Sequence, residues 1–111
     1  MATVEVEQRE RVTVVSLSRP EVRNAVDGAT ARALASAFHE FDANPDSDVA
    51  ILYGKYGSFC AGADLKERAT LPPLQVKEFI FTIRDLFSSI ENLNKPVIAA
   101  VNGVALGGGT E

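Results

Sequence analysis

Two loops hold most of the residues that could do chemistry. The first reads Ser58-Phe-Cys-Ala-Gly-Ala-Asp-Leu-Lys, and the second reads Asn102-Gly-Val-Ala-Leu-Gly-Gly-Gly-Thr-Glu. Each follows an apolar run and leads into a predicted helix start, where peptide N–H groups lack an acceptor and the helix dipole is positive. Two such loops that converge would direct two N–H donors at one carbonyl oxygen and form an oxyanion hole. Glu111 would then reach the carbons beside that carbonyl as an acid or a base.

These residues also have plainer interpretations. Residues 107–109 are compatible with a tight turn that allows close helix–strand packing, and Glu111 with a first-turn acid that favours the helix dipole. His39, the only histidine, lies off the apolar stripe of its predicted helix, which indicates a solvent-facing side chain. Cys60 has no evident histidine partner, so we predict a small buried side chain rather than a nucleophile.

Apolar periodicity predicts the elements that position the two loops. Alternating residues near the N-terminus are typical of a strand hairpin, and steps of three and four residues are typical of helices. Asp27 is the expected N-cap of the first helix. Two short apolar runs favour strands that are buried on both faces. We therefore expect strands at residues 3–7, 12–17, 49–53 and 97–101, helices at 29–41, from 64, at 76–93 and from 107, and a loop at 54–62.

Strands that alternate with helices in this order favour an α/β fold. The size and the apolar fraction, 111 residues and 46%, suit one domain over residues 1–111. The helix that opens after the glycine triplet has no body in this sequence. We therefore expect the chain to be the N-terminal part of a longer domain, truncated at the start of its active-site helix.

Composition argues against several classes of partner. The net charge is −4 and basic residues form no long run, which disfavours a nucleic-acid partner. No apolar stretch approaches the roughly 20 residues that span a bilayer. A single cysteine suits a reducing compartment. The N-terminus lacks the positive region and apolar run of a secretory signal and is acidic, unlike a transit peptide, so we expect a cytoplasmic protein without a membrane partner.

Three segments of the chain closely resemble the crotonase (enoyl-CoA hydratase/isomerase) superfamily. They are Arg19-Pro-Glu-Val-Arg-Asn-Ala, Phe59-Cys-Ala-Gly-Ala-Asp-Leu and Lys95-Pro-Val-Ile-Ala-Ala-Val-Asn-Gly-Val-Ala-Leu-Gly-Gly-Gly-Thr-Glu. A glycine triplet alone is weak evidence, but three motifs in the right order are strong. The resemblance implies a crotonase-like ββα superhelix, present here without its C-terminal half.

The resemblance also implies roles for individual residues. The N–H groups of Ala63 and Gly108 would hold a thioester oxygen, and Glu111 would be the first of two catalytic glutamates, the second lying about 20 residues further on. The adenine and pantetheine parts of coenzyme A would lie along Ala61, Ala63, Asp64, Leu65 and Lys66, with Arg23 and Ala25 nearby. Arg23 and Lys66 either touch CoA phosphates or are simply solvated. No metal or separate cofactor is implied, because coenzyme A enters as part of the substrate.

By this resemblance the reaction is hydration of a 2-enoyl-CoA thioester. Alternatives are an enoyl-CoA isomerase, which needs one carboxylate, another acyl-CoA reaction of the family, or an inactive truncated fragment. The full-length protein would be a homotrimer or a hexamer. Residues 1–111 alone are expected to be inactive and prone to associate.

Overall fold

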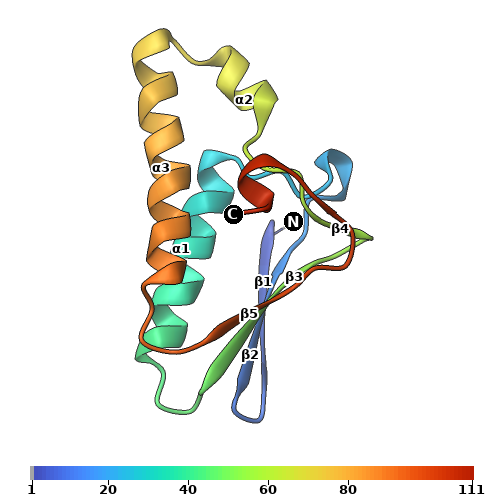
Figure 1. The fold of residues 1–111 in the computed structure, drawn as a ribbon, viewed down its shortest axis with the longest axis vertical. Helices are drawn as coiled ribbons and strands as arrows, with labels where there is room; N and C mark the ends of the chain where they lie inside the picture. Colours follow the sequence, from blue (N-terminus) through green and yellow to red (C-terminus); the bar gives the residue numbers. More distant parts are fainter. Residues whose placement is uncertain (1) are drawn as a thin grey trace.

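In the computed structural model, which describes residues 2–111, the chain begins with an antiparallel hairpin. β1 (Val4–Arg9) pairs with β2 (Val12–Leu17), as predicted. β3 (Val49–Gly54) then joins β2 in parallel, and β5 (Val97–Ala100) joins β3 in parallel. The resulting four-stranded sheet has the order β1-β2-β3-β5 (Figure 1).

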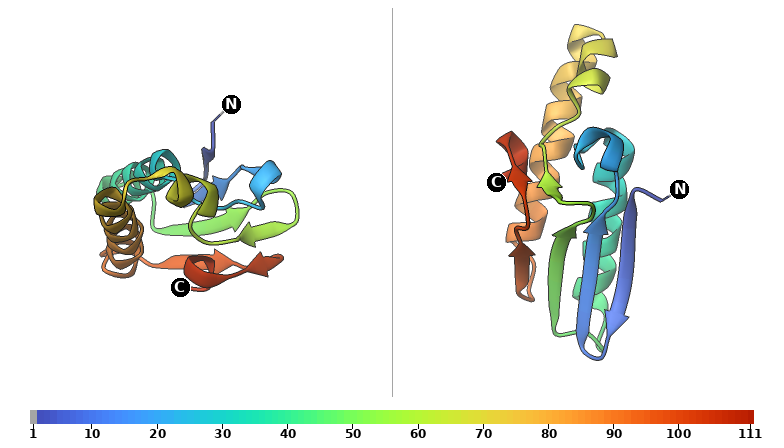
Figure 2. Two further views of the ribbon diagram at one scale, coloured as in Figure 1. Left: turned by 90° about the horizontal axis from the view of Figure 1, so that it is seen from above. Right: turned by 90° about the vertical axis from the view of Figure 1, so that its right-hand side faces the viewer.

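Helices fill the connections between the parallel strands. The short 3-10 turn η1 (Pro20–Val22) and α1 (Gly28–Ala43) lie between β2 and β3. α2 (Leu65–Thr70) and α3 (Pro73–Glu91) lie between β3 and β5. α1 and α3 lie side by side, as both views in Figure 2 show. α1 also contacts β1 and β2. The predicted α/β class is confirmed.

A second, smaller sheet carries the two loops of chemical interest. It contains β4 (Ser58–Cys60) and β6 (Val104–Ala105), which pair in parallel and lead into η2 (Gly107–Gly109). The chain thus repeats a pattern of two strands followed by a helical segment. The prediction of a loop throughout residues 54–62 was wrong, because β4 forms only by pairing with β6, in which the partners of Ser58 and Cys60 are Val104 and Ala105.

The core lies between α1 and the main sheet. Its fully buried side chains include Val15, Leu17, Leu34, Phe38 and Phe41, which confirms the apolar stripe predicted for this helix. His39 is exposed, as predicted. Asp27 caps α1 by accepting a hydrogen bond from the Thr30 backbone N–H at 2.7 Å, also as predicted.

The two strands that were expected to be buried on both faces are covered less completely. In β3 only Ala50 and Gly54 are buried, and in β5 no residue is. Ile98 is 56% exposed, and Val101, just beyond β5, is 60% exposed. β5 is an edge strand of this sheet, and among residues 2–111 it pairs with β3 alone. An apolar run therefore indicated a strand correctly but overestimated its burial.

The Asp27 cap leads to a pH-dependent prediction. Burial raises the pKa of its carboxyl, but the hydrogen bonds from Thr30 and the charge of Arg19 outweigh burial, so the pKa lies below its ordinary value. We expect Asp27→Ala to lower the free energy of unfolding by about 0.5–2 kcal/mol, the usual effect of losing an N-cap. Asp27→Asn is the matched control, since an amide oxygen still caps.

The pH dependence follows from the lowered pKa. The charged carboxylate contributes its full stabilisation above the ordinary pKa of about 4 and loses it as the pH falls through the lower folded-state value. Chemical denaturation of the full-length protein at pH 7 and at pH 3 should show the Asp27→Ala deficit shrinking at the lower pH. A deficit that grows on acidification would contradict this reading of the cap.

Candidate functional site

The loop between β4 and α2 is tied to the segment between η1 and α1 by a ladder of backbone hydrogen bonds. The Ala61 N–H donates to the Arg23 carbonyl at 3.1 Å, the Val26 N–H to the Gly62 carbonyl at 2.7 Å, and the Asp64 N–H to the Val26 carbonyl at 2.8 Å. Val26 and Ala63 thus form a parallel bridge. These hydrogen bonds join two segments that lie far apart in the chain.

This ladder determines the direction of the Ala63 N–H. In a trans peptide the C=O and the N–H point in opposite directions. The Gly62 carbonyl points at Val26, so the Ala63 N–H, which belongs to the same peptide, points away from it. Within residues 2–111 no acceptor receives a hydrogen bond from this N–H.

The glycine triplet presents a second N–H of the same kind. Gly107 has a φ of +53°, and its carbonyl accepts a hydrogen bond from the Thr110 N–H at 3.0 Å. That carbonyl therefore points along η2, and the Gly108 N–H of the same peptide points out of the N-terminal end of the turn. The described part of the chain supplies no acceptor for it either.

The two loops converge, as predicted. The Leu106 N–H donates to the Cys60 carbonyl at 3.1 Å. A Cβ added to Gly62 would lie 2.8 Å from the Leu106 carbonyl oxygen and 3.3 Å from the Gly108 nitrogen. A Cβ added to Gly109 would clash with the Cys60 carbonyl oxygen. Glycine at these positions allows the two backbones to touch, which places the loop that contains Ala63 directly against the loop that contains Gly108.

Glu111 and Gly108 share a cavity of about 910 Å³. Side chains of the core and of α3, including Leu34, Phe87 and Ile90, form most of its wall, and Glu91 and Arg84 also contribute to its lining. Glu111 is exposed. The structure therefore brings Glu111 to the same space as the glycine loop, whereas Ala63 lies outside the lining of this cavity.

The residues predicted to contact coenzyme A differ in their exposure to solvent. Arg23, Leu65 and Lys66 are exposed, with Leu65 70% exposed. Ala25 and Asp64 are buried. Asp64 is the N-cap of α2, accepting hydrogen bonds from the backbone of Lys66 at 2.9 Å and of Glu67 at 3.2 Å. Its carboxylate is thus occupied within the chain, and Ala61 is half-buried.

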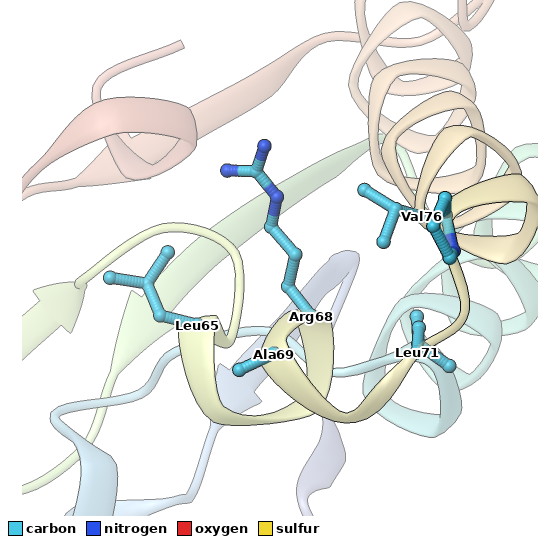
Figure 3. A pocket seen from close by; sticks show the side chains of 6 residues that line it. Leu65, Arg68, Ala69, Leu71 and Val76 are labelled. Atoms are coloured by element: carbon cyan, nitrogen blue, oxygen red, sulfur yellow. The ribbon is translucent and has the colours of Figure 1, made fainter.

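A smaller cavity of about 570 Å³ lies between α2 and α3. Figure 3 shows the side chains of Leu65, Arg68 and Val76 extending toward this space, with Ala69 and Leu71 beside it. Leu65 joins this cavity to the first loop, because it follows the Asp64 cap directly.

Cys60 is not a nucleophile in this arrangement. Its side chain is 3% exposed, and burial raises the pKa of the thiol, against a weaker opposing effect of the hydrogen bond from the Gly62 N–H at 3.4 Å. A buried thiol with a raised pKa stays protonated and unreactive at neutral pH. The prediction of a small buried side chain is confirmed.

Arg19 and Asn24 belong to the first of the three motifs, but the sequence predicted no role for either residue. Asn24 is fully buried, its side-chain amide donates to the carbonyls of Lys55 at 2.9 Å and Ser58 at 2.8 Å, and its Oδ1 accepts from the Arg19 N–H at 2.7 Å. Its φ of +60° is a conformation that Asn tolerates better than most residues. The Asn-Ala pair that follows the Pro20 turn was the sequence feature that could have indicated this structural role of Asn24.

No three His, Cys, Asp or Glu side chains gather as a metal site within residues 2–111. The helices of the same range include none that is long and apolar enough to cross a membrane.

Gly62 offers a direct test of the convergence of the two loops. Its φ of +97° and the 2.8 Å approach to the Leu106 carbonyl both oppose any side chain. Gly57 is the matched control, because it has a similar φ of +82° and nothing within 4 Å of an added Cβ. Both alanine substitutions should cost about 1–2 kcal/mol of stability through backbone strain.

Only Gly62→Ala should also separate the two loops. We expect it to remove most of the activity of the full-length protein, and Gly57→Ala to leave activity within about twofold because its Cβ meets no other group. Urea denaturation together with a turnover assay checks both parts. Equal activities of the two variants would show that the close approach is not needed.

The sequence profile of a family described as enoyl-CoA hydratase/isomerase matches residues 7–111. The chain is 42% identical over 98 residues to a relative from Arabidopsis thaliana named probable enoyl-CoA hydratase 2, mitochondrial, covering 87% of this chain and 33% of that one. It is 38% identical over 120 residues to the enoyl-CoA hydratase EchA19 of Mycobacterium tuberculosis, covering 100% and 45%.

Among solved structures, an enoyl-CoA hydratase from Bacillus anthracis superposes with a TM-score of 0.94 at 38% identity. The match covers 98% of this chain and 43% of that one. The chain therefore spans less than half the length of each of these relatives, and over that length it has their fold.

Proposed function

The chain belongs to the enoyl-CoA hydratase/isomerase family, and we propose that its full-length protein adds water to the double bond of 2-enoyl-CoA thioesters. One observation carries the proposal. Two peptide N–H groups without an acceptor, on Ala63 and Gly108, belong to loops in direct contact, and Glu111 lies at the end of the second loop. The names of the relatives, which include hydratases, support the same reaction.

The two N–H groups would act on the thioester oxygen. When water adds to C3 of the enoyl group, negative charge passes through C2 to this oxygen as an enolate. Donors that already face the oxygen stabilise that charge without reorganisation, and losing one such donor typically costs roughly 3 kcal/mol in the barrier. Both donors here are backbone groups whose peptides are held by hydrogen bonds on their carbonyl side, which is the preorganisation such a site needs.

Glu111 would act as the general acid–base group. Its carboxylate orients a water molecule and takes a proton from it as the oxygen attacks C3, and a proton is delivered to C2 to complete the addition. In the hydratase proposal a second carboxylate takes part in orienting the water molecule and transferring these protons. The cavity of about 910 Å³ beside Glu111 has the size that ligand sites commonly show, about 300–1,000 Å³.

Coenzyme A would contact the exposed edge of the first loop. Lys66 and Arg23 have exposed side chains that can approach phosphates, and Leu65 offers an exposed apolar surface to the pantetheine. Ala25, Ala61 and Asp64 would contribute through backbone and shape, since Ala25 and Asp64 are buried. We also propose assembly into a homotrimer or hexamer, supported by the exposed apolar residues Phe81, Ile98 and Val101.

A substrate comparison tests the proposal. The full-length protein is mixed with crotonyl-CoA, and hydration is followed by the loss of the enoyl-thioester absorbance. The same protein is given a 3-enoyl-CoA, whose conversion to the 2-enoyl isomer raises that absorbance. Hydration of crotonyl-CoA supports the hydratase proposal. Isomerisation without hydration favours the single-carboxylate alternative, and no reaction with either substrate contradicts both.

A further inference from the structure

Arg19 has the most extensive set of polar contacts near the two loops. Its guanidinium Nη1 donates to the Ala25 carbonyl at 2.7 Å and to Asp64 Oδ2 at 3.1 Å, and its Nη2 lies 3.4 Å from Asp27 Oδ2. Its Nε lies 3.8 Å from Glu21. The Arg19 side chain is 12% exposed and that of Asp64 10%. A cation of this kind, buried among carboxylates, holds several groups in one geometry because leaving any of them unpaired is costly.

The contacts of Arg19 span both sides of the backbone ladder. Ala25 precedes Val26, and Asp64 follows Ala63, so the guanidinium joins the two neighbours of the Val26–Ala63 bridge. Asp64 in turn has two oxygens with separate partners. Oδ2 pairs with Arg19, while Oδ1 caps the first turn of α2. Arg19 therefore orients the residue that links the Ala63 peptide to α2.

Further contacts connect Arg19, which precedes η1, to the start of α1 as well as to the start of α2. Its own N–H is held by Asn24, and Asp27, which caps α1, lies against its Nη2. Glu67 of α2 accepts from the Gly28 N–H of α1 at 3.0 Å, so α2 is joined to α1 independently of Arg19. Loss of the Arg19 side chain would thus leave the helices connected but release the link between Ala25 and Asp64 that flanks the Ala63 peptide.

We propose that Arg19 is a positioning residue that keeps the Ala63 N–H aimed at the substrate oxygen. This inference rests on the proposed function, because it concerns the same donor. Arg19 touches neither the substrate nor the reacting atoms. It acts through Asp64 and Ala25, so its loss should weaken stabilisation of the transition state more than binding of coenzyme A.

The test compares three variants of the full-length protein. Arg19→Met removes the charge and the donors, and Arg19→Lys keeps the charge but cannot reach all the partners at once. Arg11→Met is the matched control, since Arg11 also pairs with a carboxylate, Asp48, and donates to a backbone carbonyl, that of Pro45, far from the two loops. The readouts are kcat and KM for crotonyl-CoA, and the infrared C=O frequency of bound butyryl-CoA, which cannot be hydrated.

We expect Arg19→Met to lower kcat by about 10–100-fold, somewhat less than deletion of a donor, with KM changed by less than about threefold. The C=O band, shifted to lower frequency in the wild-type complex, should move back toward its value in free butyryl-CoA. Arg19→Lys should give intermediate values, and Arg11→Met should match the wild type. If Arg19→Met does not fold, Arg19→Lys decides the question by the same two readouts.

The outcomes separate this inference from the proposed function. A wild-type protein that is active, with Arg19 variants whose kcat and C=O frequency equal its own, would overturn the role of Arg19 alone. A wild-type protein that neither hydrates crotonyl-CoA nor binds butyryl-CoA would overturn the proposed function together with this inference. A fall in kcat that Arg11→Met reproduces would show a general loss of stability and would also overturn the positioning role.

Discussion

Glu111→Gln is expected to reduce the hydration rate of the full-length protein by about 10²–10⁴-fold, the usual contribution of a general acid–base group. An amide keeps the size of the side chain but cannot accept a proton from water. The N–H groups of Ala63 and Gly108 are backbone atoms and remain in place. Affinity for coenzyme A should therefore stay near the wild-type value, so that the loss falls on kcat.

Glu91→Gln is the matched control for this experiment. Glu91 lies at the end of α3 and lines the same cavity as Glu111, but it is not attached to the glycine loop. Loss of one negative charge from the cavity is thus common to both variants, while the proposed proton transfer is lost only in the first. Steady-state kinetics with crotonyl-CoA, together with calorimetric titration of coenzyme A, measures both effects. If Glu111→Gln has the wild-type turnover rate, Glu111 takes no part in proton transfer and only interacts favourably with the helix dipole.

Gly108→Pro is expected to lower kcat by about 10²–10³-fold, as the loss of one oxyanion donor does elsewhere. Proline has no N–H, so the substitution deletes the proposed donor itself. A proline in the first turn of a helical segment is otherwise compatible with the backbone, because that N–H has no intrahelical partner. Binding of coenzyme A without an acyl group should be retained.

Gly108→Ala separates the chemical effect of that substitution from its steric effect. Alanine keeps the N–H but adds a Cβ, which would lie 2.8 Å from Cε2 of the Phe87 ring on α3. We expect the alanine variant to retain far more activity than the proline variant, and the double variant Gly108→Ala with Phe87→Leu to regain part of the remaining loss. Equal loss of turnover and of coenzyme A binding in the proline variant would instead indicate misfolding.

Local sequence was sufficient for most of the elements. Alternation predicted the β1–β2 hairpin, and the spacing of Leu34, Phe38 and Phe41 predicted the buried face of α1. Asp27 and Asp64 both precede helices, and both proved to be N-caps. These features depend on interactions between residues a few positions apart, and such interactions leave a periodic or positional pattern in the sequence.

Other features depended on contacts between distant segments. β4 and β6 are three and two residues long, too short for any pattern, and each exists because the other lies beside it. The exposure of β5 follows from its position at the edge of the sheet rather than from its apolar composition. Neither property can be read from a window of neighbouring residues.

Some features of the candidate site were likewise predictable from local sequence, and others depended on the tertiary structure. Its glycines, its Ala-Gly-Ala-Asp loop and Glu111 are visible in the sequence because close backbone approach and proton transfer require those residue types. The tertiary structure alone decided that the Ala63 and Gly108 N–H groups lack acceptors and that Gly62 touches the Leu106–Gly108 turn. It also decided that Arg19 and Asp64, 45 positions apart, pair beside the Ala63 peptide. The direction of an N–H is determined by the partner of the carbonyl in the same peptide, and that partner lies in another part of the chain.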